Sequence, residues 1–262
     1  MGHSRIGTLP ATRRWKEVVQ LIADGADVSK VAEATLKAAE LAFAWVQEDV
    51  GFREAANLMV QIAQTTKDQN PTAALAKLGI EISENTSVAE VAMAVGEALD
   101  QRVNAQRGRS DFGEMAGKAL VSAVIGQIKD KLPTLFEPTR DDIAGALRSA
   151  GQEKGFGEFA SHFFSRVTGD SLDYFLSKTL ATKLGEGQRF ATNNQMAEFM
   201  GAMRTLCKET AVISKEYAGG WLSKHRFEEG GNISRETIGG FAWYGMQKMR
   251  AELAMRAIEH EH

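Results

Sequence analysis

Proline is scarce in this chain. Only four prolines occur in 262 residues, at positions 10, 71, 133 and 138. Because proline breaks helices more strongly than any other residue, the long stretches between these positions are free to form long helices. With 44% hydrophobic and 25% charged residues, the composition is that of a globular protein that can bury a core. We therefore expect helices to dominate the fold.

Apolar residues recur at spacings of three and four through most of the chain, which is typical of amphipathic helices. Four helix starts carry a capping signal, at Ser87, Thr139, Thr192 and Ser234. Residues 79–83 alternate like a strand, but a single short strand has no partner, so we interpret this segment as an extended connector. These patterns predict an all-α protein, a multi-helix bundle of about 8–10 helices.

Several element boundaries are expected in the carboxy-terminal part. Glycines at 151, 155 and 157 predict a turn, and Asp170 is interpreted as the start of a further helix. One long helix is expected to run from Thr192 to Tyr217. Glycine and aromatic residues then predict a loop over 217–232 before the last helix.

Aromatic residues are unevenly distributed along the chain. Residues 1–110 contain four of them, whereas residues 111–262 contain sixteen. A polar break around Arg107 and Arg109 separates the two regions. We therefore predict two packed helical subdomains, an Ala/Val-rich one at 1–108 and an aromatic- and Met-rich one at 109–262.

Metal, cofactor and membrane sites find little support. Cys207 is the only cysteine, which excludes an intrachain disulfide, and its helical phase with Met203 and Thr210 favours a core position over a catalytic thiol. The five histidines lack metal-ligand spacing, so we expect no metal and no cofactor. Neither a signal peptide nor an apolar stretch long enough for a bilayer is recognised, which predicts a cytoplasmic protein without membrane contact.

Two segments carry the candidate binding residues. In residues 185–194, a glycine-rich stretch leads into a capped helix start, where Arg189, Asn193 and backbone amides suit an anion. In residues 217–232, aromatic and basic residues alternate, a pattern that suits either a protein-binding hot spot or stacked bases, with the candidates Trp221, Lys224, His225 and Arg226. Plain structural roles, a helix cap and a buried corner, also fit both segments.

The charge balance bears on function. A net charge of −3, from 31 basic and 34 acidic residues, argues against a large nucleic-acid surface. No P-loop, Rossmann motif or catalytic constellation is recognised, which favours a non-catalytic protein over an enzyme. We expect a helical interaction or adaptor subunit of an intracellular assembly, with a protein partner bound in the carboxy-terminal half; homo-oligomerisation stays open. The alternatives are a nucleic-acid- or phosphate-binding module that uses 185–194 and 217–232, and an enzyme with an unrecognised acid-based site.

Overall fold

The computed structural model describes residues 12–40, 46–65, 68, 70–84, 86–132 and 138–259, and over these ranges the protein is all-α. Ten helices have ten or more residues; α5 (Pro71–Lys77) is shorter. The amino-terminal part contains α1 (Arg13–Ala23), α2 (Val28–Ala38), the 3₁₀ turn η1 (Val46–Glu48), α4 (Val50–Gln64) and α6 (Val88–Ala105). The carboxy-terminal part contains α7 (Asp111–Lys129), α8 (Arg140–Ser149), α9 (Glu153–Ala181), α10 (Asn193–Thr210), α11 (Val212–Glu228) and α12 (Arg235–Glu259). The predicted multi-helix bundle is confirmed.

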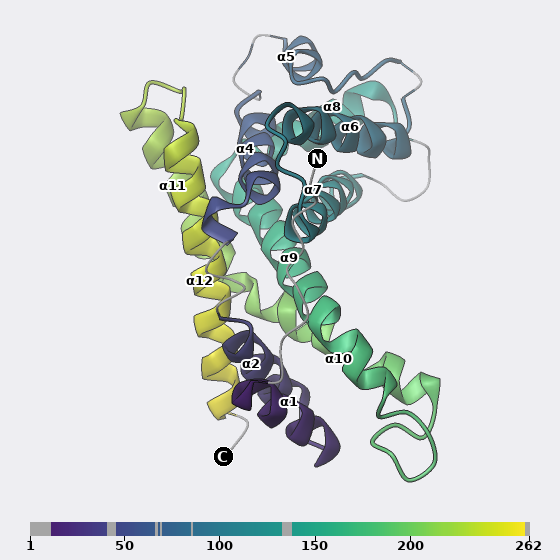
Figure 1. The fold of residues 1–262 in the computed structure, drawn as a ribbon. Helices are drawn as coiled ribbons and strands as arrows, with labels where there is room; N and C mark the ends of the chain where they lie inside the picture. Colours follow the sequence, from purple (N-terminus) through teal and green to yellow (C-terminus); the bar gives the residue numbers. More distant parts are fainter. Residues whose placement is uncertain are drawn as a thin grey trace.

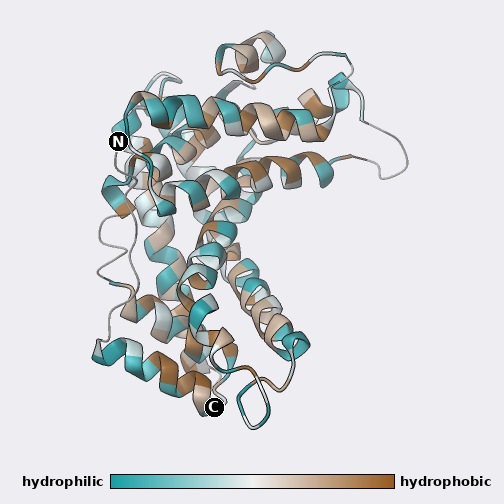
Figure 2. Cartoon of the chain, turned by 45° about the vertical axis from the view of Figure 1, so that its right-hand side comes forward, coloured by the Kyte–Doolittle hydropathy of each residue, from teal (hydrophilic) through white to brown (hydrophobic). Residues whose placement is uncertain are grey.

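Helix α9 is the axis of the fold. It packs against α2, α7, α10, α11 and α12 and crosses the middle of the molecule in Figure 1. Helices α4 to α8 gather at the upper end of this view, α1, α2 and α10 lie at the lower end, and α11 and α12 run along the left side. Figure 2 shows α6 and α7 side by side, with hydrophobic residues along both.

Phenylalanines of α9 form the centre of the core. Fully buried aromatic rings occupy four positions of this helix: Phe156, Phe159, Phe163 and Phe164. The Phe163 ring stacks on Phe52 of α4, with centroids 6.1 Å apart, and the Phe164 ring meets Phe241 of α12 at 5.8 Å. Because burying one such side chain stabilises a protein by about 1.5–3 kcal/mol, these rings hold α4, α9 and α12 together.

One continuous hydrophobic core includes residues from both sides of the predicted subdomain boundary, from Val18 on α1 to Leu253 on α12. Helices α4 and α6 pack against α7, and α2 packs against α10 and α12. The expected boundary near residue 108 coincides with the turn between α6 and α7. A division into two subdomains stays a prediction.

The four capping signals read from the sequence are present. Ser87 with Glu90 and Thr139 with Asp142 form capping boxes. Two further backbone amides are capped, that of Gln195 by Thr192 Oγ1 at 3.3 Å and that of Thr237 by Ser234 Oγ at 3.1 Å. Such bonds join residues only three positions apart, so local sequence is sufficient to specify them.

The predicted helix start at Asp170 is wrong, because residue 170 lies inside α9. Its carboxylate accepts a hydrogen bond from Arg166 Nε at 2.9 Å, one helical turn earlier, and caps nothing. The expected continuous helix over 192–217 is also wrong, because α10 ends at Thr210 and α11 begins at Val212, with Ala211 between them.

The glycine-rich turn predicted at 151–157 and the loop predicted at 217–232 are helical over most of their length. Gly155 and Gly157 lie in α9, and residues 217–228 belong to α11. Gly157 and Gly219 allow α9 and α11 to pack closely and do not form turns. A Cβ atom added to Gly157 would lie 2.7 Å from the carbonyl oxygen of Lys215, and one added to Gly219 would lie 2.9 Å from the carbonyl carbon of Glu153.

Helices α4 and α7 cross at two glycines beside a shared pair of caps. Asp49 accepts the amide of Phe52 at the start of α4, and Ser110 accepts the amide of Gly113 at the start of α7, both at 2.8 Å. The Ser110 hydroxyl also donates to the second Asp49 oxygen at 2.5 Å. A Cβ atom at Gly113 would lie only 2.9 Å from the Cα of Gly51, so the two helices approach each other through backbone.

We predict that Gly113→Ala destabilises the protein by about 1–3 kcal/mol, because the added methyl group meets backbone and the Ser110 cap. Gly145→Ala on α8 is the matched control. Nothing lies within 4 Å of a Cβ atom at residue 145, so the higher helix propensity of alanine should leave stability unchanged or raise it by up to about 1 kcal/mol. Urea unfolding followed by circular dichroism measures both effects, and equal free energies of unfolding for the two variants would contradict the crossing described.

Candidate interaction sites

The six predicted site residues fall at two separate places. Arg189 and Asn193 belong to the segment between α9 and α10 and the first turn of α10, at the lower right of Figure 1. The other four lie on the last two turns of α11, which ends at the upper left. The structure therefore brings the basic residues of the two segments to no common groove.

Arg189 is engaged by its own fold. One terminal nitrogen donates to the carbonyl oxygen of Ala26 at 3.2 Å, in the turn between α1 and α2. The guanidinium also lies over the rings of Phe190 and Phe199, at 5.6 and 5.9 Å from their centroids. Asn193 is exposed as the first residue of α10. The arginine thus joins the α10 start to the α1–α2 turn.

Arg226 is buried, with only 9% of the residue exposed. One terminal nitrogen donates to the carbonyl oxygen of Ala63 at 2.6 Å, in the last turn of α4. The other donates to the carbonyl oxygen of Gly151 at 2.5 Å, between α8 and α9. Because the guanidinium satisfies carbonyl groups at two helix ends, we assign Arg226 a structural role and not a place on the binding surface.

Trp221 and His225 form the partly buried side of the same helix end. The indole stacks on Phe241 of α12, with centroids 4.3 Å apart, and lies 5.0 Å from the imidazole of His225. The His225 Nδ1 is 3.2 Å from Glu229. Glu229 also accepts the backbone amide of Ser234 at 2.7 Å, which closes the turn between α11 and α12.

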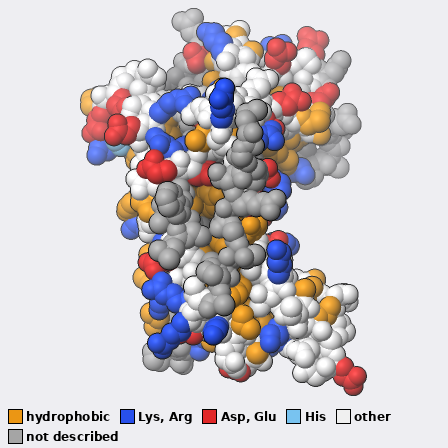
Figure 3. Space-filling model, viewed as in Figure 1, with side chains coloured by type: hydrophobic (Ala, Val, Ile, Leu, Met, Phe, Trp, Pro, Cys, Tyr) orange, Lys and Arg blue, Asp and Glu red, His pale blue; other side chains and the backbone are white. Residues whose placement is uncertain are grey.

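Phe227 is the residue that sequence reasoning missed. It is 90% exposed, more than any other large hydrophobic residue in the described part of the chain. Lys224 precedes it by one turn, and its Nζ atom lies 3.9 Å from Oε1 of Glu228. The side chains of Lys224 and Glu228 are 64% and 49% exposed. In Figure 3 this end of the molecule, at the upper left, presents acidic, basic and hydrophobic side chains together.

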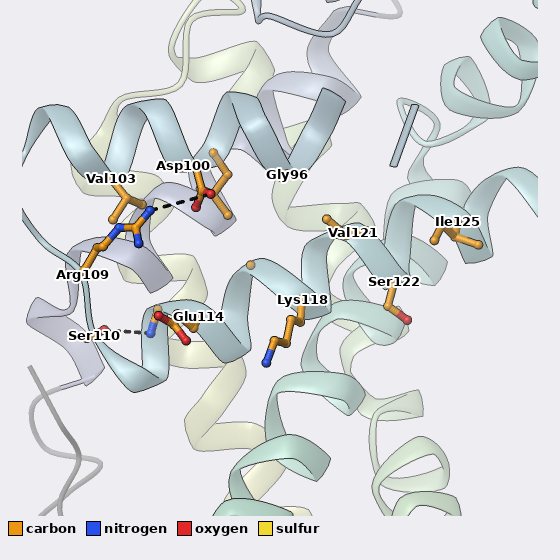
Figure 4. A pocket seen from close by; sticks show the side chains of 13 residues that line it. Gly96, Asp100, Val103, Arg109, Ser110, Glu114, Lys118, Val121, Ser122 and Ile125 are labelled. Carbon is orange, nitrogen blue, oxygen red and sulfur yellow. Dashed lines mark hydrogen bonds and ion pairs between the residues drawn. The ribbon is translucent and has the colours of Figure 1, made fainter. Parts of the chain in front are cut away.

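A second candidate surface is a groove between α6 and α7, with a volume of about 490 Å³ (Figure 4). Apolar and glycine residues line most of it: Gly96, Leu99, Val103, Gly113, Gly117, Val121 and Ile125. Charged side chains stand at its edges, Asp100 with Arg109 on one side and Glu114 with Lys118 on α7. The Arg109 guanidinium and the Asp100 carboxylate are 3.9 Å apart. The groove thus combines an apolar floor with charged edges.

The Cys207 side chain is buried, as its helical phase predicts. Burial raises the pKa of the Cys207 thiol to about 12, so the thiolate is not populated at neutral pH. No cluster of three or more His, Cys, Asp or Glu side chains suited to a metal ion occurs within the described ranges. Likewise, none of the helices described combines the length and hydrophobicity needed to cross a bilayer.

Comparisons with protein-family models, with curated proteins and with solved structures found no match to this chain.

We predict that Arg226→Met destabilises the protein by about 2–4 kcal/mol, because hydrogen bonds from a buried charged donor to two carbonyl groups are lost. Lys224→Met is the control on the same helix, and it should change stability by less than about 0.5 kcal/mol because that side chain is exposed. Urea denaturation of both variants gives the free energies. A mild effect of Arg226→Met would show that the guanidinium does not hold the helix ends.

Asp49, which caps the start of α4, gives a pH-dependent prediction. Burial raises the pKa of its carboxyl above the ordinary 3.8, although hydrogen bonds from Ser110 and the Phe52 amide oppose this shift. The folded state therefore holds the proton more tightly, and the contribution of Asp49 to stability is full below about pH 4 and is lost as pH rises through the folded-state pKa. Asp49→Asn should match or exceed the wild type in stability at neutral pH, and this advantage should disappear near pH 4, as measured by urea unfolding at both pH values.

The control for this prediction is Asp49→Ala, which removes the cap of α4 and the acceptor for Ser110. It should cost about 1–2 kcal/mol at either pH. If the asparagine variant is as unstable as the alanine variant at neutral pH, the ionised carboxylate stabilises the fold and the predicted sign is wrong.

Proposed function

We propose that the protein is a non-catalytic adaptor that captures a protein partner at the end of α11. The observation that carries the proposal is the contrast between two neighbouring residues. Arg226 is 9% exposed and bonded to two other segments, whereas Phe227 is 90% exposed. An aromatic ring held in water by a fixed backbone is the kind of residue that dominates binding energy at protein interfaces.

The rigid surroundings of Phe227 support this role. Besides the Arg226 bonds, Gln64 Nε2 at the end of α4 donates to the carbonyl oxygen of Gly231 at 3.0 Å, just beyond α11. Glu229 fixes the following turn through the amide of Ser234. Binding then requires little ordering of this helix end, which lowers the entropy lost on association.

The partner that fits this end presents an apolar pocket with charged groups at its margin. Phe227 supplies the apolar anchor, and Lys224 and Glu228 supply one exposed charge of each sign beside it. Rim charges of this kind contribute orientation and association rate more than affinity. The proposal includes the expectation from the sequence that the protein acts in the cytoplasm as part of an intracellular assembly.

The nucleic-acid and phosphate alternative draws less support from the arrangement. It requires Arg189, Lys224 and Arg226 to face one ligand, yet Arg189 bonds the α1–α2 turn and Arg226 bonds α4 and the α8–α9 turn. The alternative of an acid-based enzyme draws no support from Asp170 or Asp142, since the first pairs with Arg166 and the second completes a capping box.

We predict that Phe227→Ala weakens partner binding by about thirtyfold, because truncating an aromatic anchor costs about 2 kcal/mol. The matched control is Val212→Ala, since Val212 is 48% exposed at the opposite end of the same helix and should not affect binding. Affinity purification from the native host identifies the partner, and titration of the purified partner against both variants measures the affinities.

The same purification, repeated with nuclease, separates the proposals. Capture that survives nuclease and depends on Phe227 supports the adaptor. Capture that nuclease abolishes would favour the nucleic-acid alternative, and capture that Phe227→Ala leaves unchanged would place the partner surface elsewhere.

A further inference from the structure

The α6–α7 groove is lined by glycines, and an exposed methionine, Met93, lies one helical turn from it on α6. Gly96 on α6 and Gly117 on α7 have no side chains to fill the groove, and a Cβ atom added to Gly96 would lie 3.8 Å from Val121 across it. Met93 precedes Gly96 by one helical turn and is 60% exposed. A flexible apolar side chain therefore projects beside a depression of apolar and glycine residues, and the two features lie on the same helix face.

The charges at the groove are arranged so that two copies of this surface can face each other with opposite charges in contact. Glu114 and Lys118 are exposed, line the groove and are separated by one turn of α7 (Figure 4). If two α7 helices cross antiparallel about a point midway between these residues, Glu114 of each copy faces Lys118 of the other. The remaining pair, Asp100 and Arg109, adds one charge of each sign, so that two copies meet without net repulsion.

We propose that this groove is the interface of a homodimer with two-fold symmetry. The α6–α7 pairs of two copies pack face to face as a four-helix arrangement, and Glu114 pairs with Lys118 across the axis. A strongly basic or acidic ligand is not matched by an edge with two acids and two bases. This surface is separate from the end of α11, so the inference stands apart from the proposed adaptor role.

The experiment is a charge exchange on the full chain, read by sedimentation velocity and light scattering over a wide range of concentration. The wild type should be a dimer. Glu114→Lys and Lys118→Glu should each weaken dimerisation by about tenfold, because symmetry turns two attractive contacts into two repulsive ones. The double variant, Glu114→Lys with Lys118→Glu, should restore the dimer, since its charges are again self-complementary.

Two further variants guard against effects on folding. Gly96→Leu should give a well-folded monomer, because leucine favours the helix while its side chain fills the groove. Glu17→Lys on α1, an exposed position away from the groove, should leave the dimer unchanged. Circular dichroism checks that every variant remains helical.

Three results would overturn the inference. The first is a wild type that stays monomeric at all concentrations, which would leave the groove to a different protein. The second is a dimer that Gly96→Leu and both single charge variants leave intact, since it would form through another surface. The third is a loss of dimer that the double exchange does not restore.

Discussion

The burial of α9 is the constraint on which the rest of the structure depends. Its buried residues do not form a single stripe but extend around most of the helix, from Phe156 at one end to Leu180 at the other. Helices α2, α7, α10, α11 and α12 cover this broad buried surface. The remaining strip of α9 is polar and includes the exposed residues Arg166 and Lys178. The positions of both candidate surfaces follow from this arrangement, because α6 packs on the outside of α7 and α11 extends along α9 to an end at which Phe227 is exposed.

Local signals in the sequence were sufficient for the fold class and for the caps. A hydroxyl at Ser87 and a carboxylate at Glu90 bond within one turn, so no distant residue decides whether that helix starts there. Asp170 shows where this reasoning ends. The residues next to Asp170 in sequence fit a helix start and a helix interior equally well. Only the buried residues that continue through Leu172 and Leu176 show that Asp170 lies inside a helix.

Glycine was the residue most easily misread. Gly25, Gly230 and Gly231 adopt positive φ and do mark turns. Gly157 and Gly219 are helical, and the reason for glycine there is the backbone of a helix that is distant in sequence. The buried series Ala218, Leu222 and Arg226, spaced by four, was a helix signal that could have placed Phe227 outside. The groove was not accessible to such reasoning, because it depends on how α6 and α7 pack and on where side chains are missing.

The hydrogen bonds of Arg226 have a consequence for the order in which the chain folds. They join residues 63, 151 and 226, which are separated by 163 and 75 positions in sequence. Contacts over such separations require large loops to close, so they form late relative to individual helices. The geometry around Phe227 is therefore complete only after the distant segments have met, and an incomplete chain or a misfolded one does not present this helix end in the same way. A partner that recognises the fixed geometry would thereby distinguish finished molecules from unfinished ones.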